Sequence, residues 1–311
     1  MGKKCIKAAA IMVALLIVPL AITMIFSGMP KSMKHEAKEA VGNHGSKPTS
    51  YSMDEYIMMA MIANMDLSMN METLKAQAVI VRTTIYEKLE ESSEKALTLE
   101  KLGLETMTLD QLKKQVSIEE YTTAVSNLEN AIYGTRGEIL TYQGKPIKAL
   151  FHYANTGKTR SYKEAYGKEL PYLESVDSEK DVQAEVGITT KEYKKAELLG
   201  KLKKKYTITE VTEDNLVDAL EIKEKEKTGY VHTVKVGKVE ITGEAFAEIF
   251  GLNSTNFYLE EKEGGIRIVC RGKGSGLGFS QYGANQMAES GASYEELLRY
   301  YYRGTTVCHI E

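Results

Sequence analysis

The chain has 311 residues, of which 43% are hydrophobic and 27% charged, and its formal net charge at pH 7 is −3. This length can form one large domain or two small ones, and the apolar content is ample for a core. The weak net charge leaves no electrostatic footprint for nucleic acid, so we expect no nucleic-acid partner. The three cysteines, Cys5, Cys270 and Cys308, are too few and too scattered for a disulfide framework, although one Cys270–Cys308 bond outside the cell stays open.

The amino-terminal residues predict a membrane anchor. Three lysines within the first seven residues precede an almost uninterrupted apolar run, residues 8–26. A run of about 19 apolar residues spans a hydrocarbon core, and lysines on its short amino-terminal side place that end in the cytoplasm. We therefore expect residues 1–27 to form a cytoplasmic tip and a single-pass transmembrane helix in the cell membrane, with the following domain extracytoplasmic. A cleavable signal peptide is the alternative, but the run is long for one and no clear Ala-x-Ala site follows it. The polar residues 28–50 predict a juxtamembrane linker.

The next part of the chain predicts a helical region, around residues 52–133. Within the stretch 56–86, the half that begins at Met71 has apolar residues on one face at helical spacing, namely Leu74, Ala78, Val81 and Ile85. The same half also contains three polar residues that an ordinary surface helix would not require, Lys75, Gln77 and Arg82. Residues 119–133 repeat the helical pattern. The segment between them, 88–115, is rich in Lys and Glu, which is typical of a solvated face.

Beyond residue 136 the pattern changes. Residues 137–142 and 147–151 predict two strands joined by a Gln-Gly-Lys-Pro turn, and residues 231–236 alternate like a further strand. Residues 182–206 predict a helix with a basic end. The predicted fold class is therefore α+β, a helical region packed on twisted antiparallel strands.

Glycines dominate one stretch near the carboxyl end. Residues 271–284 read RGKGSGLGFSQYGA, with a glycine at every second position from 272 to 278. No strand–GxxxxGK(S/T)–helix order surrounds them, so this is not a phosphate-binding loop. Glycines at this density let the backbone lie close to another backbone or to a ligand.

Several blocks over residues 51–307 closely resemble the stage II sporulation protein D (SpoIID)/LytB family, with their order and spacing intact. They are residues 74–79 followed by Arg82-Thr83, residues 131–159 and residues 271–284. The resemblance implies that residues 51–311 form a SpoIID/LytB-like domain that acts on peptidoglycan, and that the glycine-rich stretch packs beside the first helix. The enzymes of this family are lytic transglycosylases. The chain departs from the family's glycine pattern at Ser275, where the family has His, and at Phe279, where it has Met.

A further departure concerns the family's catalytic glutamate. The family reads Glu-Met-Pro ahead of its Lys-Ala-Gln block, whereas this chain reads Asn64-Met65-Asp66. An amide has no titratable proton for the leaving oxygen, and loss of general-acid help costs about 10²–10⁴-fold in rate, or about 3–5 kcal/mol. Asp66 is a candidate surrogate acid. It lies about 200° around a helix from residue 64, or outside the helix if the helix ends there. It would therefore point elsewhere unless the backbone differs locally.

The resemblance also implies which residues line a glycan groove. They are Lys75, Gln77, Arg82, Ser280, Gln281 and Tyr282. The seven-residue spacing of Lys75 and Arg82 puts both on one helical face, and both suit the carboxylates of peptidoglycan. Structural alternatives stay open, namely salt bridges for these two cations, a helix-to-loop hydrogen bond for Gln77 and a core position for Tyr282.

Residues and resemblance together predict a membrane-anchored protein that acts on or binds peptidoglycan glycan strands during the engulfment stage of sporulation. Asn64 predicts that its lytic transglycosylase activity is weak or absent. Two alternatives stay open: a fully active transglycosylase that uses another acid such as Asp66, and a glycan-binding module that enhances an amidase. The expected partners are glycan strands, a sporulation cell-wall amidase and a membrane partner. His152 and His309 lack partners at metal-ligand spacing, so we expect no metal site and no cofactor.

Overall fold

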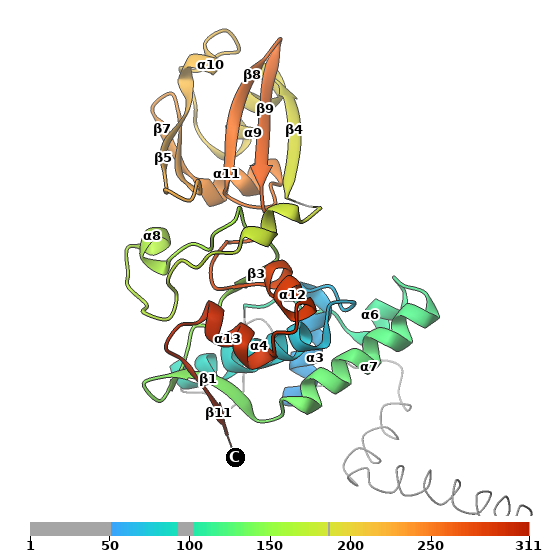
Figure 1. Ribbon diagram of the computed structural model, residues 1–311. Coiled ribbons are helices and arrows are strands. Elements are labelled where there is room, and N and C mark those ends of the chain that lie inside the picture. The colour runs from blue at the N-terminus through green and yellow to red at the C-terminus, as the bar shows by residue number, and fades with distance from the viewer. Residues whose placement is uncertain (1–50, 93–102, 186, 311) are drawn as a thin grey trace, which may run out of the picture. The chain divides into compact units, whose positions relative to one another are not determined.

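The computed structural model describes residues 51–92, 103–185 and 187–310 (Figure 1). Tyr51–Glu311 form one compact unit, which has a mainly helical part and a part built of two small sheets. The predicted anchor and linker, residues 1–50, lie outside the described residues. Within the described ranges, no helix is both long enough and apolar enough to cross a membrane.

Helix α4 is the centre of the helical part. The helices of this part are α3 (Met53–Asn64), α4 (Met71–Glu91), α6 (Leu109–Lys113), α7 (Ile118–Gly134), α12 (Gln281–Glu289) and α13 (Tyr294–Tyr301). Capping boxes fix the starts of α3, α6, α7 and α13, because the N-cap side chain and the side chain three residues later each accept a backbone N–H. Helices α3, α7, α12 and α13 all contact α4 (Figure 1). Its buried side chains include the predicted apolar face, Leu74, Ala78, Val81 and Ile85.

A small antiparallel sheet in the order β11-β1-β2 packs on the same helices. Its strands are β1 (Glu138–Tyr142), β2 (Lys145–Pro146) and β11 (Thr306–His309). Gln143 and Gly144 form the turn with φ of 53° and 78°, the positive values that a two-residue hairpin of this type requires. The predicted four-residue turn and the strand predicted over residues 147–151 are therefore wrong in extent, because Lys145 and Pro146 already pair with β1 as β2 and residues 147–150 are not in a strand. Cys308 lies in this sheet and Cys270 in another, and both thiols are free.

The second part consists of two three-stranded antiparallel sheets, in the orders β4-β9-β8 and β5-β6-β7. Its elements are β4 (Ile188–Lys194), α9 (Lys195–Lys205), α10 (Leu216–Ala219), β5 (Leu220–Lys225), β6 (Val231–Val236), β7 (Val239–Thr242), α11 (Gly243–Phe250), β8 (Phe257–Lys262) and β9 (Gly265–Arg271). Phe246 stacks on Phe257 in its core, with ring centroids 5.0 Å apart. The predicted helix over 182–206 is wrong in its first half, since residues 188–194 pair with β9 along their whole length.

Short elements connect the two parts. They are β3 (Phe151–His152), α8 (Tyr162–Tyr166), the 3₁₀ helix η1 (Glu179–Gln183) and β10 (Phe279–Ser280). Strand β3 pairs with β10 in parallel, and the larger sheets are antiparallel. Mixed helices and antiparallel sheets confirm the α+β class.

The glycine segment, residues 271–284, packs against the chain around β3. Gly274 and Gly278 have φ of +100° and +68°, in the left-handed region that side chains disfavour. A Cβ on Gly278 would lie 1.9 Å from Leu150 O, and one on Gly274 would lie 2.8 Å from His152 Cβ. At these two positions the glycines therefore serve a close approach to the chain around β3.

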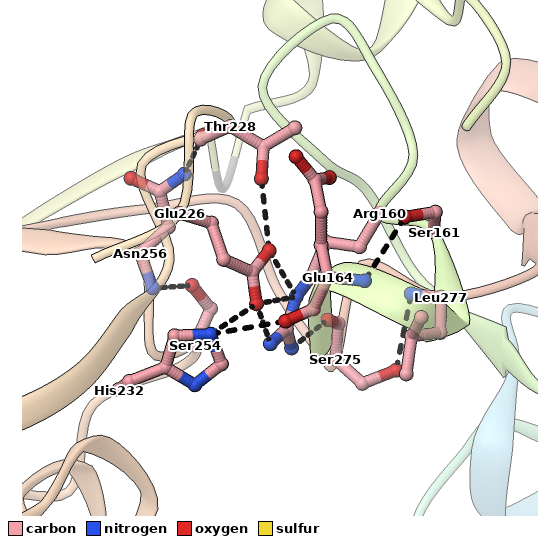
Figure 2. Close-up of polar contacts among 10 residues, drawn as sticks. All are labelled: Arg160, Ser161, Glu164, Glu226, Thr228, His232, Ser254, Asn256, Ser275 and Leu277. Carbon is pink, nitrogen blue, oxygen red and sulfur yellow. Dashed lines mark hydrogen bonds and ion pairs between the residues drawn. The ribbon is translucent and has the colours of Figure 1, made fainter. Parts of the chain in front are cut away.

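A buried ion pair joins the two parts beside this segment (Figure 2). Arg160 Nε lies 2.9 Å from Glu226 Oε2, Arg160 Nη2 pairs with Glu226 Oε1, and Arg160 Nη1 donates to Ser275 O at 2.9 Å. His232 Nε2 lies 3.1 Å from Glu226 Oε1, and Thr228 Oγ1 donates to Oε2 at 3.0 Å. The side chains of Arg160 and Glu226 are only 5% and 2% exposed. Because both charges are paired and hydrogen-bonded, the structure tolerates their burial.

Candidate functional site

A cleft of ≈730 Å³ opens where α3 ends. Its lining comes from the end of α3, the loop before α6, β3, the loop after α11, the glycine segment and the start of α12. The lining residues are Ala63, Asn64, Met65, Asp66, Glu105, Phe151, His152, Tyr153, Asn253, Lys273, Gly274 and Gln281. We call it the Asn64 cleft. Amides, carboxylates, one ammonium group and aromatic rings suit a polar ligand with many hydroxyls.

Asn64 is the last residue of α3, and its amide nitrogen is tied to the protein. Asn64 Nδ2 donates to Ala60 O and to Glu105 O, both at 2.8 Å. Two carbonyl acceptors at the negative end of a helix favour a neutral donor and disfavour a carboxylate. A carboxyl group at this position would therefore have a raised pKa, which suits a proton donor.

Asp66 lines the same cleft because α3 ends at Asn64. Met65 is extended, with φ −149° and ψ 165°, and alternate residues of an extended chain point to the same side. The backbone therefore differs locally from a continued helix, in which Asp66 would point elsewhere. Asp66 Oδ1 accepts from Ser68 N at 2.9 Å and from Ser68 Oγ at 2.7 Å. Both contacts use the carboxylate as an acceptor.

Gln281 is the predicted groove residue that reaches Asn64 directly. Its Nε2 donates to Asn64 O at 3.0 Å and to Gln77 Oε1 at 3.2 Å. Gln77 is fully buried behind it. This pair therefore links α4 and α12 to the end of α3 and fixes residue 64 against the cleft.

Comparisons with known proteins identify the family of this chain. Residues 44–142 match the family described as SpoIID, stage II sporulation protein. The chain is 30% identical over 261 residues to stage II sporulation protein D of Bacillus amyloliquefaciens, which covers 82% of this chain and 74% of that protein. The chain belongs to the stage II sporulation protein D family.

Two other relatives extend the comparison. The stage II sporulation protein D of Bacillus subtilis (strain 168) is 29% identical over 260 residues, with the same coverage of both chains, 82% and 74%. The amidase enhancer of Bacillus subtilis (strain 168) is 27% identical over 229 residues, 58% of this chain and 32% of that protein.

The cations that the family resemblance assigned to the groove are not among the cleft's lining residues. Lys75 Nζ forms an ion pair with Glu72 at 2.7 Å, which is the salt-bridge alternative. Arg82 is 2% exposed and donates to three backbone carbonyls at the end of α7 and the start of β1. These acceptors are Thr135 O at 2.7 Å, Glu138 O at 3.1 Å and Ile132 O at 3.3 Å. Arg82 therefore has a structural role and no exposed face for a glycan, whereas the Lys75 ammonium is paired with Glu72 and stays partly exposed.

Ser280 and Tyr282 contact residues close to the cleft but do not line it. Ser280 is fully buried, donates to the Asp181 carboxylate at 2.7 and 2.9 Å, and accepts from Gly283 N as the N-cap of α12. Burial raises the pKa of Asp181 to about 6, and the Ser280 hydrogen bond opposes that rise. Tyr282 is half-buried, with its ring centroid 6.3 Å from that of Tyr153. Neither Ser280 nor Tyr282 lines the cleft.

Sequence reasoning placed Asn64, Asp66 and Gln281 in the site and missed other lining residues with polar or aromatic side chains, among them Glu105, Tyr153, Asn253 and Lys273. Tyr153 gives the cleft an aromatic ring, and Lys273 Nζ lies 5.0 Å from its centroid. Lys273 had one usable signal, a charged side chain between two glycines of the family's most distinctive segment. Asn253 had one as well, because residues 252–257 are a further block that resembles the family.

His152 also lines the cleft, with its imidazole buried. Its Nδ1 lies 3.0 Å from Leu277 O, and its Nε2 lies 3.1 Å from Asn155 Nδ2. Since the carbonyl can only accept and the amide N–H donates, Nδ1 carries the proton. Burial lowers the pKa of His152 to about 4, so the ring is neutral. Within the described ranges, no group of three His, Cys, Asp or Glu side chains is placed to hold a metal ion.

Proposed function

We propose that this chain binds glycan strands of peptidoglycan in the Asn64 cleft during sporulation, with weak or no lytic transglycosylase activity. One observation carries the proposal: an amide that lines the cleft at the end of α3, where the family has its catalytic glutamate. The names of the relatives, stage II sporulation protein D and amidase enhancer, support a role in sporulation and at the cell wall. We also propose that residues 8–26 anchor the chain in the cell membrane with the cleft outside.

The chemistry of the reaction explains why residue 64 matters. A lytic transglycosylase uses a hydroxyl of the sugar itself as nucleophile, so one acid/base residue suffices where ordinary glycosidases need two carboxyl groups. Asn64 cannot protonate a leaving oxygen, and its amide nitrogen already donates to Ala60 O and Glu105 O. What it offers a ligand is the Oδ1 acceptor. The residue can hold a sugar hydroxyl without cutting the chain.

Two other functions have a specific observation in their favour. Asp66 lines the cleft on the same side as Asn64, which supports an active enzyme with a relocated acid. The 27% identity to an amidase enhancer supports a module that binds glycan and stimulates an amidase.

One set of experiments separates these functions. The full chain is incubated with purified peptidoglycan, bound protein is measured by sedimentation, and released anhydro-muropeptides are measured by mass spectrometry. We expect retention on the glycan with little anhydro product. Abundant product that disappears in Asp66→Asn would identify an active enzyme. A faster digest by an added wall amidase would identify the enhancer, and failure to sediment with peptidoglycan would refute the proposal.

A further inference from the structure

Lys273 is held in the Asn64 cleft by its backbone. Its N–H donates to Ala154 O at 2.8 Å, and its carbonyl accepts from Tyr153 N at 3.1 Å and from Ala154 N at 3.2 Å. The next residue, Gly274, donates to Asn253 O at 2.8 Å. These four bonds fix the base of the Lys273 side chain beside Tyr153. The position is therefore built into the fold and does not depend on a mobile loop.

The ammonium group of Lys273 is the one cation among the residues that line the cleft. Among the described residues, no carboxylate lies within ion-pair distance of it, and its close contact is the Tyr153 ring, 5.0 Å from Nζ to the centroid. Lys75 and Arg82, by contrast, are engaged by Glu72 and by backbone carbonyls. A cation without an acidic partner in a binding cleft is available for an anionic ligand group.

Among the described residues, neither acidic lining residue, Asp66 or Glu105, forms an ion pair with this cation. The Asp66 carboxylate accepts from Ser68 N at 2.9 Å and from Ser68 Oγ at 2.7 Å. Glu105 enters the cleft from the loop whose backbone carbonyl accepts from Asn64. Lys273 lies over the ring face of Tyr153 and belongs to the glycine segment. The cleft therefore has a cationic position beside an aromatic face.

We propose that Lys273 forms a subsite for the carboxylate of an acidic sugar, with the adjoining sugar ring against Tyr153. In peptidoglycan that group is the lactyl carboxylate of N-acetylmuramic acid from which the stem peptide has been removed. This inference rests on the proposed glycan binding, and it makes Lys273 the residue that favours strands whose carboxylates are free. Asn253, which lines the same end of the cleft, supplies an amide for neighbouring polar groups.

The test compares two forms of one ligand. Glycan strands freed of peptides are used as such and after conversion of their carboxylates to amides, and binding to the full chain is measured at low ionic strength. We expect wild-type protein to bind the native strands about 10-fold more tightly than the amidated ones, the usual effect of one charge-assisted contact. Lys273→Gln should lose this difference, and Lys273→Arg should retain it. Lys158→Gln, a change at an exposed lysine outside the cleft, is the matched control and should behave as wild type.

The outcomes separate the subsite from the general function. If wild type and Lys273→Gln bind both forms equally, the carboxylate subsite is refuted and glycan binding stands. If Lys273→Gln weakens both forms by the same factor, the lysine contributes packing and the inference also fails. If no variant binds either form, the proposed function fails together with the subsite.

Discussion

Asn64→Glu would put a titratable proton at the end of α3, where the family has its catalytic glutamate. The backbone of residue 64 is held in place, because Gln281 Nε2 donates to Asn64 O at 3.0 Å. If the rest of the cleft is intact, the gain should equal the usual contribution of a general acid, about 10²–10⁴-fold in rate, or about 3–5 kcal/mol. The assay is release of anhydro-muropeptides from peptidoglycan, read by mass spectrometry.

The surroundings of residue 64 also set the pH dependence and the stability of this variant. The amide hydrogen bonds to Ala60 O and Glu105 O are both 2.8 Å long, and an ionised carboxylate can make neither. Each lost bond costs about 0.5–1.5 kcal/mol, and the negative end of the helix adds about 0.3–1 kcal/mol. A protonated carboxyl keeps one donor, so the site raises the pKa of the introduced group. Activity should therefore be highest at mildly acidic pH and fall as the pH rises through that pKa.

Asn64→Gln is the matched control, because it has the length of glutamate and no titratable proton. Both variants must retain glycan binding and a cooperative unfolding transition before their rates are compared. Equal rates for the two variants at every pH would refute the reasoning and would point to a second disabling change, such as Ser275 in the glycine segment.

Three further predictions concern buried ionisable side chains, namely Arg160, Asp181 and His152. Arg160→Met leaves Glu226 buried without its cation, and we expect chemical denaturation to show a loss of about 3–5 kcal/mol in unfolding free energy. Burial raises the pKa of Asp181 from 3.8 to about 6, so the folded state binds this proton more tightly and loses stability as the pH rises between these values. Asp181→Asn should remove that loss, which is about 3 kcal/mol at about 1.4 kcal/mol per pKa unit. Burial lowers the pKa of His152 from 6.5 to about 4, so the folded state loses stability as the pH falls between these values. His152→Gln should remove this opposite loss, again about 3 kcal/mol.

These three predictions have their own controls. Lys158→Met breaks an ion pair with Asp177 in which both side chains are about two-thirds exposed, and it should change stability by less than about 1 kcal/mol. A loss at Arg160 no larger than this control would contradict the first prediction. Over the pH range between about 4 and about 6, Asp181 and His152 change the unfolding free energy in opposite directions. Their two contributions should therefore nearly cancel in the wild type. If the unfolding free energies of Asp181→Asn and His152→Gln change with pH as that of the wild type does, both predictions are contradicted.

Local patterns predicted the helical region, the first strand of the hairpin and the position of its turn, because these signals are local, but they placed the second strand too late in the chain. Helical spacing from Met71 identified the buried face of α4, and Gln143-Gly144 marked a tight turn. Residues 188–194 were predicted as helix because their partner is distant. They become a strand by pairing with β9, whose residues 265–271 lie far along the chain. The composition of residues 188–194 does not show that they pair with β9.

The candidate site divides in the same way. The family blocks located Asn64 and Gln281, which the structure joins by a hydrogen bond. They could not show that Arg82 faces carbonyls of α7 and β1, since those acceptors are 50 to 56 residues further along the chain. Nor could they show that α3 ends at Asn64, which brings Asp66 to the cleft. They could not show that Lys273 lines the cleft either, because its backbone pairs with Ala154, which is distant in the chain.

The contact between Asn64 and Gln281 spans 217 positions of the chain. A ribosome therefore synthesises Asn64 long before Gln281, which donates to its carbonyl. Until α12 has been made and has packed, the cleft lacks Gln281 and the Asn64 carbonyl lacks this donor. A protein truncated before α12 would still contain Asn64, yet it would lack the hydrogen bond that holds residue 64 against the cleft.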